Sequence, residues 1–551
     1  MHTIDCFDTT VCPAVTAAPA EGLPGFVSRQ LKLGEVQPER AEPASRYFNG
    51  WVFAKLGKKG GLMQKANRRD FMKFMASAGA VVAAEEAIPS YGESQPVPGA
   101  VKAWRTTHDA KFQPVPSPPQ WETGKEVSPL AIYLDPATQY QEILGFGGAF
   151  TDASCSLMHQ MAPDARKAFL SDLYGPAGLR LSVGRTCIGT SDYSTKMYSY
   201  DDTPEPDPNL EHFSIDQDKA WILPALREAR EVNPDLYLFS CVWSPPGWMK
   251  SGGSMLGGCM RERWFATHAQ YFVKFLQAYA DAGVKVQAIT VNNEVDTDQD
   301  GHFPATLWAQ QHEMVFVANH LGPALEKASL DAKIWILDHN YDLWGRAVDE
   351  LSNPAVAKYV DGVAWHSYAG TPDAMSRVHQ MFPEKHMYFT EGGPAAHLFG
   401  ALQGPRPSPP YGTDWSRWSH AFTDMLRNRA RCICVWNLLL DENGRPDLTN
   451  PPRPLRRGGL VSIDSKSKEL TYSGNYYAFP HYSKAIGRGA YVFASSGDLP
   501  GVDHVAAENP DKSRVLVVTN SNSTLQQVQC HLGPHSLQLA LPPDSITTLT
   551  W

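Results

Sequence analysis

The sequence of 551 residues lacks the features that mark a membrane protein or a nucleic-acid-binding protein. No apolar run reaches the roughly 18 residues that a membrane-spanning helix needs, so no stable membrane span is predicted. Lys and Arg together number 49 against 58 Asp and Glu, which gives a formal net charge of -9. Because phosphate binding needs clustered Lys and Arg, and no long basic run is present, nucleic acid is not a predicted partner.

Cysteine is also sparse, with nine residues spread along the chain. No Cys-x-x-Cys pair and no Cys/His cluster has zinc-finger spacing, so neither a disulfide framework nor a zinc site is predicted. Cys187, Cys241, Cys432 and Cys434 lie inside apolar runs and are predicted to be buried free thiols. The acidic stretch 296–301 lacks the terminal Glu of an EF-hand loop, so the sequence predicts no metal site. Nothing in the sequence indicates the oligomeric state.

An export signature lies within the first 90 residues. Arg68 and Arg69 are followed by Phe71, Lys73 and the mildly apolar stretch 74–84, which ends in small residues. This order is typical of a twin-arginine signal, although a short soluble helix with two surface arginines is the alternative. We therefore expect translation to start at Met63, a signal over 63–90, an extension without a folded role over 1–62, and export to the periplasm or the extracellular medium.

From about residue 130 the chain alternates short β-rich runs with amphipathic segments, which is typical of βαβ units. Helices are predicted over 220–232, 263–282 and 306–328. Eight strands are predicted, over 143–150, 179–187, 236–243, 286–293, 333–338, 362–368, 387–390 and 431–438. Eight parallel strands with helices between them predict an α/β fold, a (β/α)8 TIM barrel over 141–470.

All-β segments flank the predicted barrel. Residues 85–120 are rich in Pro, Ser and Gly, so 91–140 is interpreted as a linker followed by strands that contribute to a β domain. Residues 492–551 alternate apolar and polar side chains between Ser, Asn and Pro turns. The segment 471–551 is therefore predicted to form an attached all-β, sandwich-like domain.

Polar and aromatic side chains follow nearly every predicted barrel strand. The end of such a strand is where barrel enzymes place their chemistry. An ordinary barrel would show plain turn residues at these positions. The strand ends carry Asp152, Asp192, Trp243, Asn293, Glu294, Asp338, His339, Asn340, His366, Tyr368, Glu391, Trp436 and Asn437.

Two of these residues, Glu294 and Glu391, each end an apolar run, where a carboxylate is costly unless it is paired or used. Glycoside hydrolysis needs two carboxyl groups, one to protonate the leaving oxygen and one to attack the anomeric carbon or to activate water. Strands four and seven lie on opposite sides of a barrel mouth, so the two carboxylates are expected to face each other across a sugar. The alternative for each residue is a surface salt bridge.

Eight motifs follow one another along the chain. They are 145–152 (GFGGAFTD), 191–194 (SDYS), 243–250 (WSPPGWMK), 293–294 (NE), 366–368 (HSY), 390–391 (TE), 436–438 (WNL) and the YY and HYSK segments within 476–484. With these motifs in this order, the sequence resembles glycoside hydrolase family 30, the group that contains the glucosylceramidases, and its bacterial members in particular. The resemblance covers about residues 145–490. Val295 departs from the pattern, because the family commonly has Pro after Asn-Glu.

The resemblance implies a barrel with an attached β-sandwich, retaining chemistry and no cofactor. At the matching positions, Glu294 would be the general acid/base and Glu391 the nucleophile. The subsite for the cleaved sugar would be lined by Asp192, Trp243, Asn293, His366, Tyr368 and Trp436, with Asn450 as a further candidate.

The implied substrate class is a carbohydrate or glycoside, with β-glucosides favoured by the motifs around Asp192 and Trp243. An endo-acting β-1,6-glucanase or a xylan-active hydrolase is the alternative enzyme, and an open cleft around 394–418 would favour it. A lipid glycoside would need exposed apolar loops, for which 255–256 and 398–399 are candidates. Arg453, Arg456 and Arg457 would suit an acidic sugar. A non-catalytic carbohydrate-binding protein is the alternative of another class, and the presence of both glutamates argues against it.

Overall fold

The computed structural model describes residues 98–123, 128, 130–392, 412–449 and 458–551. All of them belong to one compact unit, Tyr91–Trp551. The predicted export segment, Asn450, the apolar pair at 398–399 and the three arginines at 453–457 lie outside the described residues. Within the described part of the chain, no helix combines the length and the apolar character that crossing a membrane requires.

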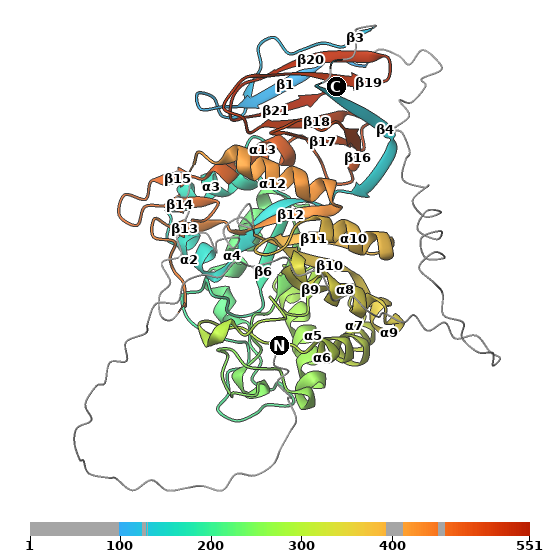
Figure 1. Ribbon diagram of the computed structural model, residues 1–551. Coiled ribbons are helices and arrows are strands. Elements are labelled where there is room, and N and C mark those ends of the chain that lie inside the picture. Colours follow the sequence, from blue (N-terminus) through green and yellow to red (C-terminus); the bar gives the residue numbers. More distant parts are fainter. Residues whose placement is uncertain (1–97, 124–127, 129, 393–411, 450–457) are drawn as a thin grey trace, which may run out of the picture. The chain divides into compact units, whose positions relative to one another are not determined.

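Eight parallel strands close into a barrel, in the order β10-β11-β12-β5-β6-β7-β8-β9 (Figure 1). They are β5 (Gly145–Phe150), β6 (Val183–Cys187), β7 (Tyr237–Cys241), β8 (Ala288–Thr290), β9 (Lys333–Asn340), β10 (Val360–His366), β11 (His386–Glu391) and β12 (Ala430–Asn437). Each lies within or overlaps one of the eight predicted strands. The prediction of a TIM barrel is confirmed.

Buried side chains from every barrel strand except β5 form one apolar cluster. This cluster consists of Val183, Phe239, Ala288, Trp335, Ala364, Tyr388, Cys432 and Cys434. On β5 glycine replaces a side chain, since a Cβ atom on Gly147 would lie 1.7 Å from the carbonyl oxygen of Val183. The four cysteines predicted to be buried free thiols are buried and free.

Helices surround the barrel. They are α2 (Asp152–His159), α3 (Pro163–Tyr174), α4 (Ile222–Val232), α5 (Phe265–Asp281), α6 (Gln310–Phe316), α7 (Gly322–Lys327), α8 (Trp344–Leu351), α9 (Pro354–Ala357), α10 (Asp373–Met381) and α12 (Trp415–Arg427). The helix predicted over 306–328 begins only at Gln310, because the backbone N–H groups of Leu307 and Trp308 donate to the carbonyls of Gly258 and Val295, at 2.9 and 2.8 Å. It passes through a π-helical turn, Val317–Leu321, just before Gly322 and Pro323, where proline cannot donate a backbone hydrogen bond.

The β domain joins strands from both sides of the barrel sequence. Its sheet runs β2-β1-β21-β18-β17-β16-β4-β19-β20-β3. The strands are β1 (Lys102–Thr106), β2 (Gln113–Pro114), β3 (Glu122–Thr123), β4 (Ala131–Glu142), β16 (Tyr491–Ser496), β17 (Val502–Glu508), β18 (Arg514–Asn520), β19 (Gln526–Leu532), β20 (His535–Leu541) and β21 (Ser545–Thr550). The predicted attachment of an all-β sandwich to the barrel is confirmed. A small sheet of β13 (Leu439–Asp441), β14 (Val461–Ile463) and β15 (Leu470–Tyr472) follows β12.

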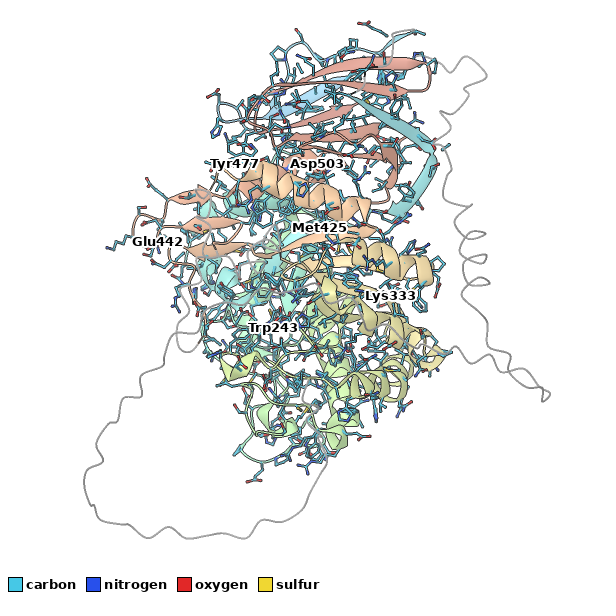
Figure 2. All side chains as sticks on the ribbon, in the orientation of Figure 1. Trp243, Lys333, Met425, Glu442, Tyr477 and Asp503 are labelled. Atoms are coloured by element: carbon cyan, nitrogen blue, oxygen red, sulfur yellow. The ribbon has the colours of Figure 1, made fainter. Side chains whose placement is uncertain are left out.

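Helices α12 and α13 (Gly474–Ser483) connect the barrel with the β domain. On α12, the hydroxyl of Ser419 hydrogen bonds to Thr519 of β18 at 2.6 Å, and His420 contacts Asp503 of β17 at 2.9 Å. Asp503 is labelled in Figure 2. On α13, buried His481 reaches Thr548 of β21 and Thr106 of β1, both at 2.8 Å. The predicted domain boundary at 470/471 falls before α13, which packs against both parts.

Candidate active site

Glu294 and Glu391 lie at the carboxyl ends of β8 and β11, as the sequence predicts. Their side chains are 13% and 7% exposed. Glu294 has a φ of 53°, in the left-handed region that a residue with a Cβ rarely adopts. Its backbone N–H donates to the carbonyl of Asp338 at 2.9 Å, which holds this conformation. Backbone strain of this kind costs about 1–3 kcal/mol and persists where the surroundings impose it, often at functional sites.

Two donors hold the Glu391 carboxylate in one orientation. Oε2 accepts from Nη1 of Arg185, and Oε1 accepts from the Tyr368 hydroxyl at 2.8 Å. Arg185 comes from β6 and Tyr368 follows β10, so strands on either side of the barrel fix this group. Charge-assisted hydrogen bonds of this type are about twice as strong as neutral ones.

Arg185 contacts five other residues of the site. Its fully buried guanidinium lies over the rings of Trp243 and Trp436, at 4.8 and 5.1 Å from their centroids. Nη2 donates to Oδ1 of Asn293 at 2.7 Å and to Oδ2 of Asp338 at 2.9 Å. Burial opposes the charge on Arg185, but Asp338 and Glu391 outweigh that effect and raise its pKa well above the usual value.

Asp338 connects Arg185, through His366, to the carboxylate of Glu294. It is fully buried and accepts from Thr290 at 2.8 Å, from Thr390 at 2.6 Å and from Nε2 of His366 at 3.0 Å. Burial alone would raise the pKa of Asp338, but Arg185 and His366 bring it well below the usual value.

His366 lies between Asp338 and Glu294. Its Nδ1 is 3.4 Å from Oε1 of Glu294. Burial disfavours the imidazolium, yet Glu391, Asp338 and Glu294 raise the pKa of His366 to about 9. The other carboxylate oxygen of Glu294, Oε2, accepts a hydrogen bond from the amide of Gln299, which begins the 3-10 turn Gln299–Gly301.

A second histidine, His339, approaches the same carboxylate. Glu294, His339 and His366 each offer one potential ligand atom, and these atoms lie within 4.8 Å of one another. Burial lowers the pKa of His339. Among the His, Cys, Asp and Glu side chains that the structure describes, these three are close enough together to hold a metal ion.

Two of the predicted aromatic residues, Trp243 and Trp436, form one wall together with Tyr193. The rings of Trp243 and Trp436 stack at 5.1 Å between centroids, and Tyr193 meets Trp436 edge-on at 6.1 Å. Trp243 is labelled in Figure 2. Asp192, directly before Tyr193, is half-buried, and its carbonyl accepts from the N–H of Leu448 at 2.7 Å. The wall therefore brings Trp243 and Trp436 together, and Asp192 directly precedes Tyr193 in the chain.

Comparison with known proteins agrees with this geometry. The glycosyl hydrolase family 30 TIM-barrel domain matches residues 143–486, and the family's beta sandwich domain matches residues 489–549. The chain belongs to glycoside hydrolase family 30. It is therefore a glycoside hydrolase, and a retaining mechanism is typical of the family.

Curated relatives of this family 30 enzyme carry two kinds of name. An endo-1,6-beta-D-glucanase of Neurospora crassa is 33% identical over 406 residues, 71% of this chain and 81% of the relative. The lysosomal acid glucosylceramidase of Mus musculus is 30% identical over 448 residues, 77% of this chain and 83% of the relative. Among solved structures, the endo-beta1,6-glucanase BT3312 matches with a TM-score of 0.71 and 26% identity, over 82% of this chain and 99% of that one.

Sequence reasoning did not assign a role to Arg185, Asp338, His339 or Gln299. A signal existed for Arg185, a lone charge inside a predicted apolar strand, where burial is costly without a partner. Asp338 and His339 were visible only as polar strand ends. Gln299 carried no signal, because its contact with Glu294 depends on the conformation of the loop after β8.

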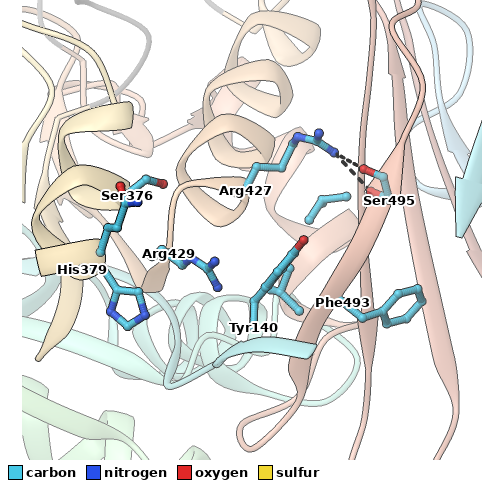
Figure 3. A pocket seen from close by; sticks show the side chains of 10 residues that line it. Tyr140, Ser376, His379, Arg427, Arg429, Phe493 and Ser495 are labelled. Atoms are coloured by element: carbon cyan, nitrogen blue, oxygen red, sulfur yellow. Dashed lines mark hydrogen bonds between the residues drawn. The ribbon is translucent and has the colours of Figure 1, made fainter. Parts of the chain in front are cut away.

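A separate cavity of about 420 Å³ lies away from both carboxylates of this family 30 enzyme, where α10, α12, β4 and β16 meet (Figure 3). Arg427 crosses it to donate to the carbonyl and the hydroxyl of Ser495, at 3.0 and 3.1 Å. Arg429 lies over the ring of Tyr140, 4.2 Å from its centroid. No Asp or Glu lines this cavity, so it cannot support chemistry with two carboxylates.

Proposed function

We propose that this chain hydrolyses β-glucosides with retention, with Glu391 as the nucleophile and Glu294 as the general acid/base. One observation carries the assignment of roles. Both oxygens of Glu391 accept hydrogen bonds, one of them from a buried guanidinium, whereas Glu294 is bonded by an amide and lies beside an imidazole. The donors to Glu391 hold its carboxylate in one orientation, as a nucleophile requires. The amide and the imidazole ring beside Glu294 suit a group that gives and takes a proton.

The proposed reaction has two displacements. In the first, an oxygen of Glu391 attacks the anomeric carbon while Glu294 gives its proton to the departing oxygen, so the aglycone leaves as an alcohol. In the second, Glu294 takes a proton from water, and the water oxygen displaces Glu391 from the sugar. Arg185 and Tyr368 orient Glu391 in both steps, and Gln299 and His366 orient Glu294.

The remaining predicted residues are proposed to hold the cleaved sugar. Trp436 would lie against the apolar side of a pyranose, with the buried ring of Trp243 stacked on it, and Asp192 would offer a carboxylate to the sugar hydroxyl groups. Since Oδ1 of Asn293 accepts from Arg185, its amide NH₂ is the group left to donate to a sugar hydroxyl. A hydrogen bond to the 2-hydroxyl strengthens in an oxocarbenium-like transition state.

The glucose preference is supported by the names of the relatives, because a β-1,6-glucan and a glucosylceramide both present a β-glucosyl unit. We favour a glucosylceramidase-like activity on single β-glucosides, which would place the enzyme in sphingolipid metabolism if the natural aglycone is a lipid. Endo-1,6-β-glucanase activity is the second candidate, favoured by the 33% identity to the Neurospora crassa enzyme and the match to BT3312.

The assignment of roles is tested with aryl β-glucosides in Glu391→Gly and Glu294→Ala. We expect both variants to lose turnover of a poor leaving group. With azide, Glu391→Gly should form the α-glucosyl azide, because azide attacks from the face that the carboxylate vacates. Glu294→Ala should keep activity on an activated aryl glucoside and form the β-glucosyl azide. The exposed Glu326→Gln is the matched control, and the reverse pattern of anomers would exchange the two roles.

The substrate is tested with β-1,6-glucan, glucosylceramide in detergent micelles, xylan and aryl β-glucosides, all with the same preparation. Release of glucose from the aryl glucoside and the lipid, without polymer cleavage, supports the favoured activity. Oligosaccharide release from β-1,6-glucan alone supports the endo-glucanase. If no substrate is cleaved and polysaccharide is still bound, a binding role replaces the proposed hydrolysis.

We also propose that the chain is exported by the twin-arginine route. The support is the order of Arg68, Arg69, Phe71 and Lys73 before an apolar stretch. Replacing both arginines with lysine should keep the protein in the cytoplasmic fraction of a host with this pathway, while the unaltered protein reaches the periplasm or the medium. Equal fractionation of the two would refute the proposal.

A further inference from the structure

Three potential metal ligands converge at the ends of three successive barrel strands. Glu294 follows β8, His339 lies in β9 and His366 ends β10. One ligand atom from each lies within 4.8 Å of the other two. The proposed hydrolysis uses Glu294 and His366 and gives His339 no task.

The hydrogen bond from His366 to Asp338 has the form found behind metal-bound histidines. Nε2 of His366 is 3.0 Å from Oδ1 of Asp338, which leaves Nδ1 as the atom that faces Glu294. A ligating histidine almost always gives its second ring N–H to a carboxylate or a carbonyl, which fixes the tautomer and the ring orientation. Asp338 is itself held by Arg185, Thr290 and Thr390, so the ring orientation of His366 is firmly set.

His339 supplies an independent observation. It is only 6% exposed, and its Nδ1 is buried without a hydrogen-bond partner in the part of the chain that the structure describes. A buried polar atom without a partner costs about 1–3 kcal/mol, so natural proteins keep few of them. Its ring meets that of His366 at 6.2 Å between centroids and an angle of 67°.

We propose that Glu294, His339 and His366 form an inhibitory site for a borderline divalent cation such as Zn²⁺, Co²⁺ or Ni²⁺. Two imidazoles and one carboxylate suit these ions, whereas Mg²⁺ and Ca²⁺ prefer oxygen ligands. The ion takes the place of any proton on Nδ1 of His366, which leaves to solvent. Zn–N and Zn–O distances are about 2.0–2.2 Å. Nδ1 of His366 and Oε1 of Glu294 are already 3.4 Å apart, and rotation of the His339 and Glu294 side chains can bring ligand atoms that are up to 4.8 Å apart closer while the ring of His366 stays in place.

Metal binding has a functional consequence that rests on the proposed role of Glu294. A carboxylate oxygen that coordinates an ion can neither give a proton to the departing oxygen nor take one from water. The ion would therefore block both displacements and would be displaced by a chelator. The three ligands come from the ends of three strands and lie far apart in the chain, so no local spacing in the sequence indicates this site.

Direct binding is tested on the full chain after treatment with a chelator, by titration with Co²⁺ and with Zn²⁺ in competition against a colorimetric indicator. We expect one ion per chain, with the intense visible absorption of Co²⁺ bound by nitrogen and oxygen in a low-symmetry site. His339→Asn and Glu294→Gln should each weaken Zn²⁺ binding more than a hundredfold, and Glu391→Gln should not. Loss of a ligand reduces affinity more than the 10–100-fold typical of a residue that only supports one.

Inhibition is tested with an aryl β-glucoside, and each variant is compared with its own rate in the absence of metal. Zn²⁺ should inhibit the unaltered enzyme, EDTA should restore its rate, and His339→Asn should need at least ten times more Zn²⁺ for half-inhibition. Cys6 and Cys12 precede the described residues, and Cys259 is partly exposed. A variant with these three cysteines replaced by Ser controls for thiols, and His212→Asn controls for a surface histidine beside Asp207.

Unchanged Zn²⁺ affinity in both His339→Asn and Glu294→Gln would overturn the site, as would binding abolished in the thiol control. Binding that follows the expected variants in a chain that hydrolyses no glycoside would uphold the site and refute the proposed function instead. Inhibition that persists in His339→Asn, together with loss of the Co²⁺ absorption, would refute the link between the site and hydrolysis.

Discussion

Replacing Arg185 with lysine tests how the active site orients its proposed nucleophile. Lysine keeps the positive charge but has one nitrogen, whereas the guanidinium of Arg185 donates to three different residues, Glu391, Asn293 and Asp338. An ammonium group drawn to Asp338 would leave Glu391 with the Tyr368 hydroxyl as its remaining donor among the bonds described above. A hydrogen bond to a charged group contributes about 1.5–3 kcal/mol.

If that contribution is realised mainly in the transition state, kcat/KM for an aryl β-glucoside should fall about 10- to 150-fold, at 1.36 kcal/mol per decade. The fold should survive in Arg185→Lys, because Asp338 keeps a cationic partner. Arg185→Met removes the cation that both Asp338 and Glu391 share and leaves His366 as the cationic partner of Asp338. This should lower the free energy of unfolding by about 3–5 kcal/mol, the cost of removing one partner from a buried ion pair. Both quantities can be measured on the same preparations, by initial rates and by urea unfolding.

The matched control is Arg166→Lys. Arg166 on α3 also makes a bidentate ion pair, with Glu228 at 2.7 and 2.9 Å, on the outside of the barrel. We expect unchanged kcat/KM and a stability change below about 1 kcal/mol, as is usual for partly exposed pairs. A kcat/KM for Arg185→Lys within twofold of the unaltered enzyme would refute the reasoning, because the guanidinium fork would then have no part in orienting Glu391.

Three further predictions follow from single contacts. Tyr368→Phe removes one donor from Glu391 and should lower kcat about tenfold or more with little change in stability, measured by initial rates and thermal unfolding. Gly147→Ala forces a Cβ atom against backbone and should cost about 3 kcal/mol or more, whereas Gly345→Ala in α8 meets open space and should stabilise by about 0.5–1 kcal/mol in urea unfolding. His268 is fully buried, and burial lowers its pKa to about 3. Since the unfolded chain binds this proton at a higher pH than the folded chain does, stability is lost as pH falls from about 6.5 towards 3, at up to about 1.4 kcal/mol per pH unit, and His268→Phe should reduce the loss between pH 7.5 and 5.

The sequence was sufficient for the barrel and for the two carboxylates, for a physical reason. Barrel strands are short, apolar and regularly spaced, and their carboxyl ends share one rim, so Glu294 and Glu391 could be placed from strand order alone. The aromatic wall of Trp243 and Trp436 followed from the same rule. Their catalytic and binding roles remain predictions.

The contacts between these residues could not be predicted, because they depend on backbone conformation and on side chains from distant strands. The left-handed φ of Glu294 and the approach of Gln299 arise in the loop after β8, which has no periodic pattern. Arg185 lies at an inward position of β6, and only the closed barrel shows that Asp338 and Glu391 reach it. The order of strands in the β domain was also beyond prediction, since β4 pairs with β16 and β19 across the whole barrel sequence.

That pairing has a consequence for the order of assembly during synthesis. Strand β4 leaves the ribosome before any barrel strand, yet its parallel ladder, which begins with Ala131 paired to Gln529, cannot form until β19 has been synthesised. Strand β1 likewise waits for β21, the last strand of the chain. The barrel sequence therefore emerges between two halves of an unfinished sheet, whose exposed edges must stay clear of other chains until translation ends. A chain cut short before Tyr491 would keep all eight barrel strands and still lack β21, which pairs with β1, and β16 and β19, which pair with β4.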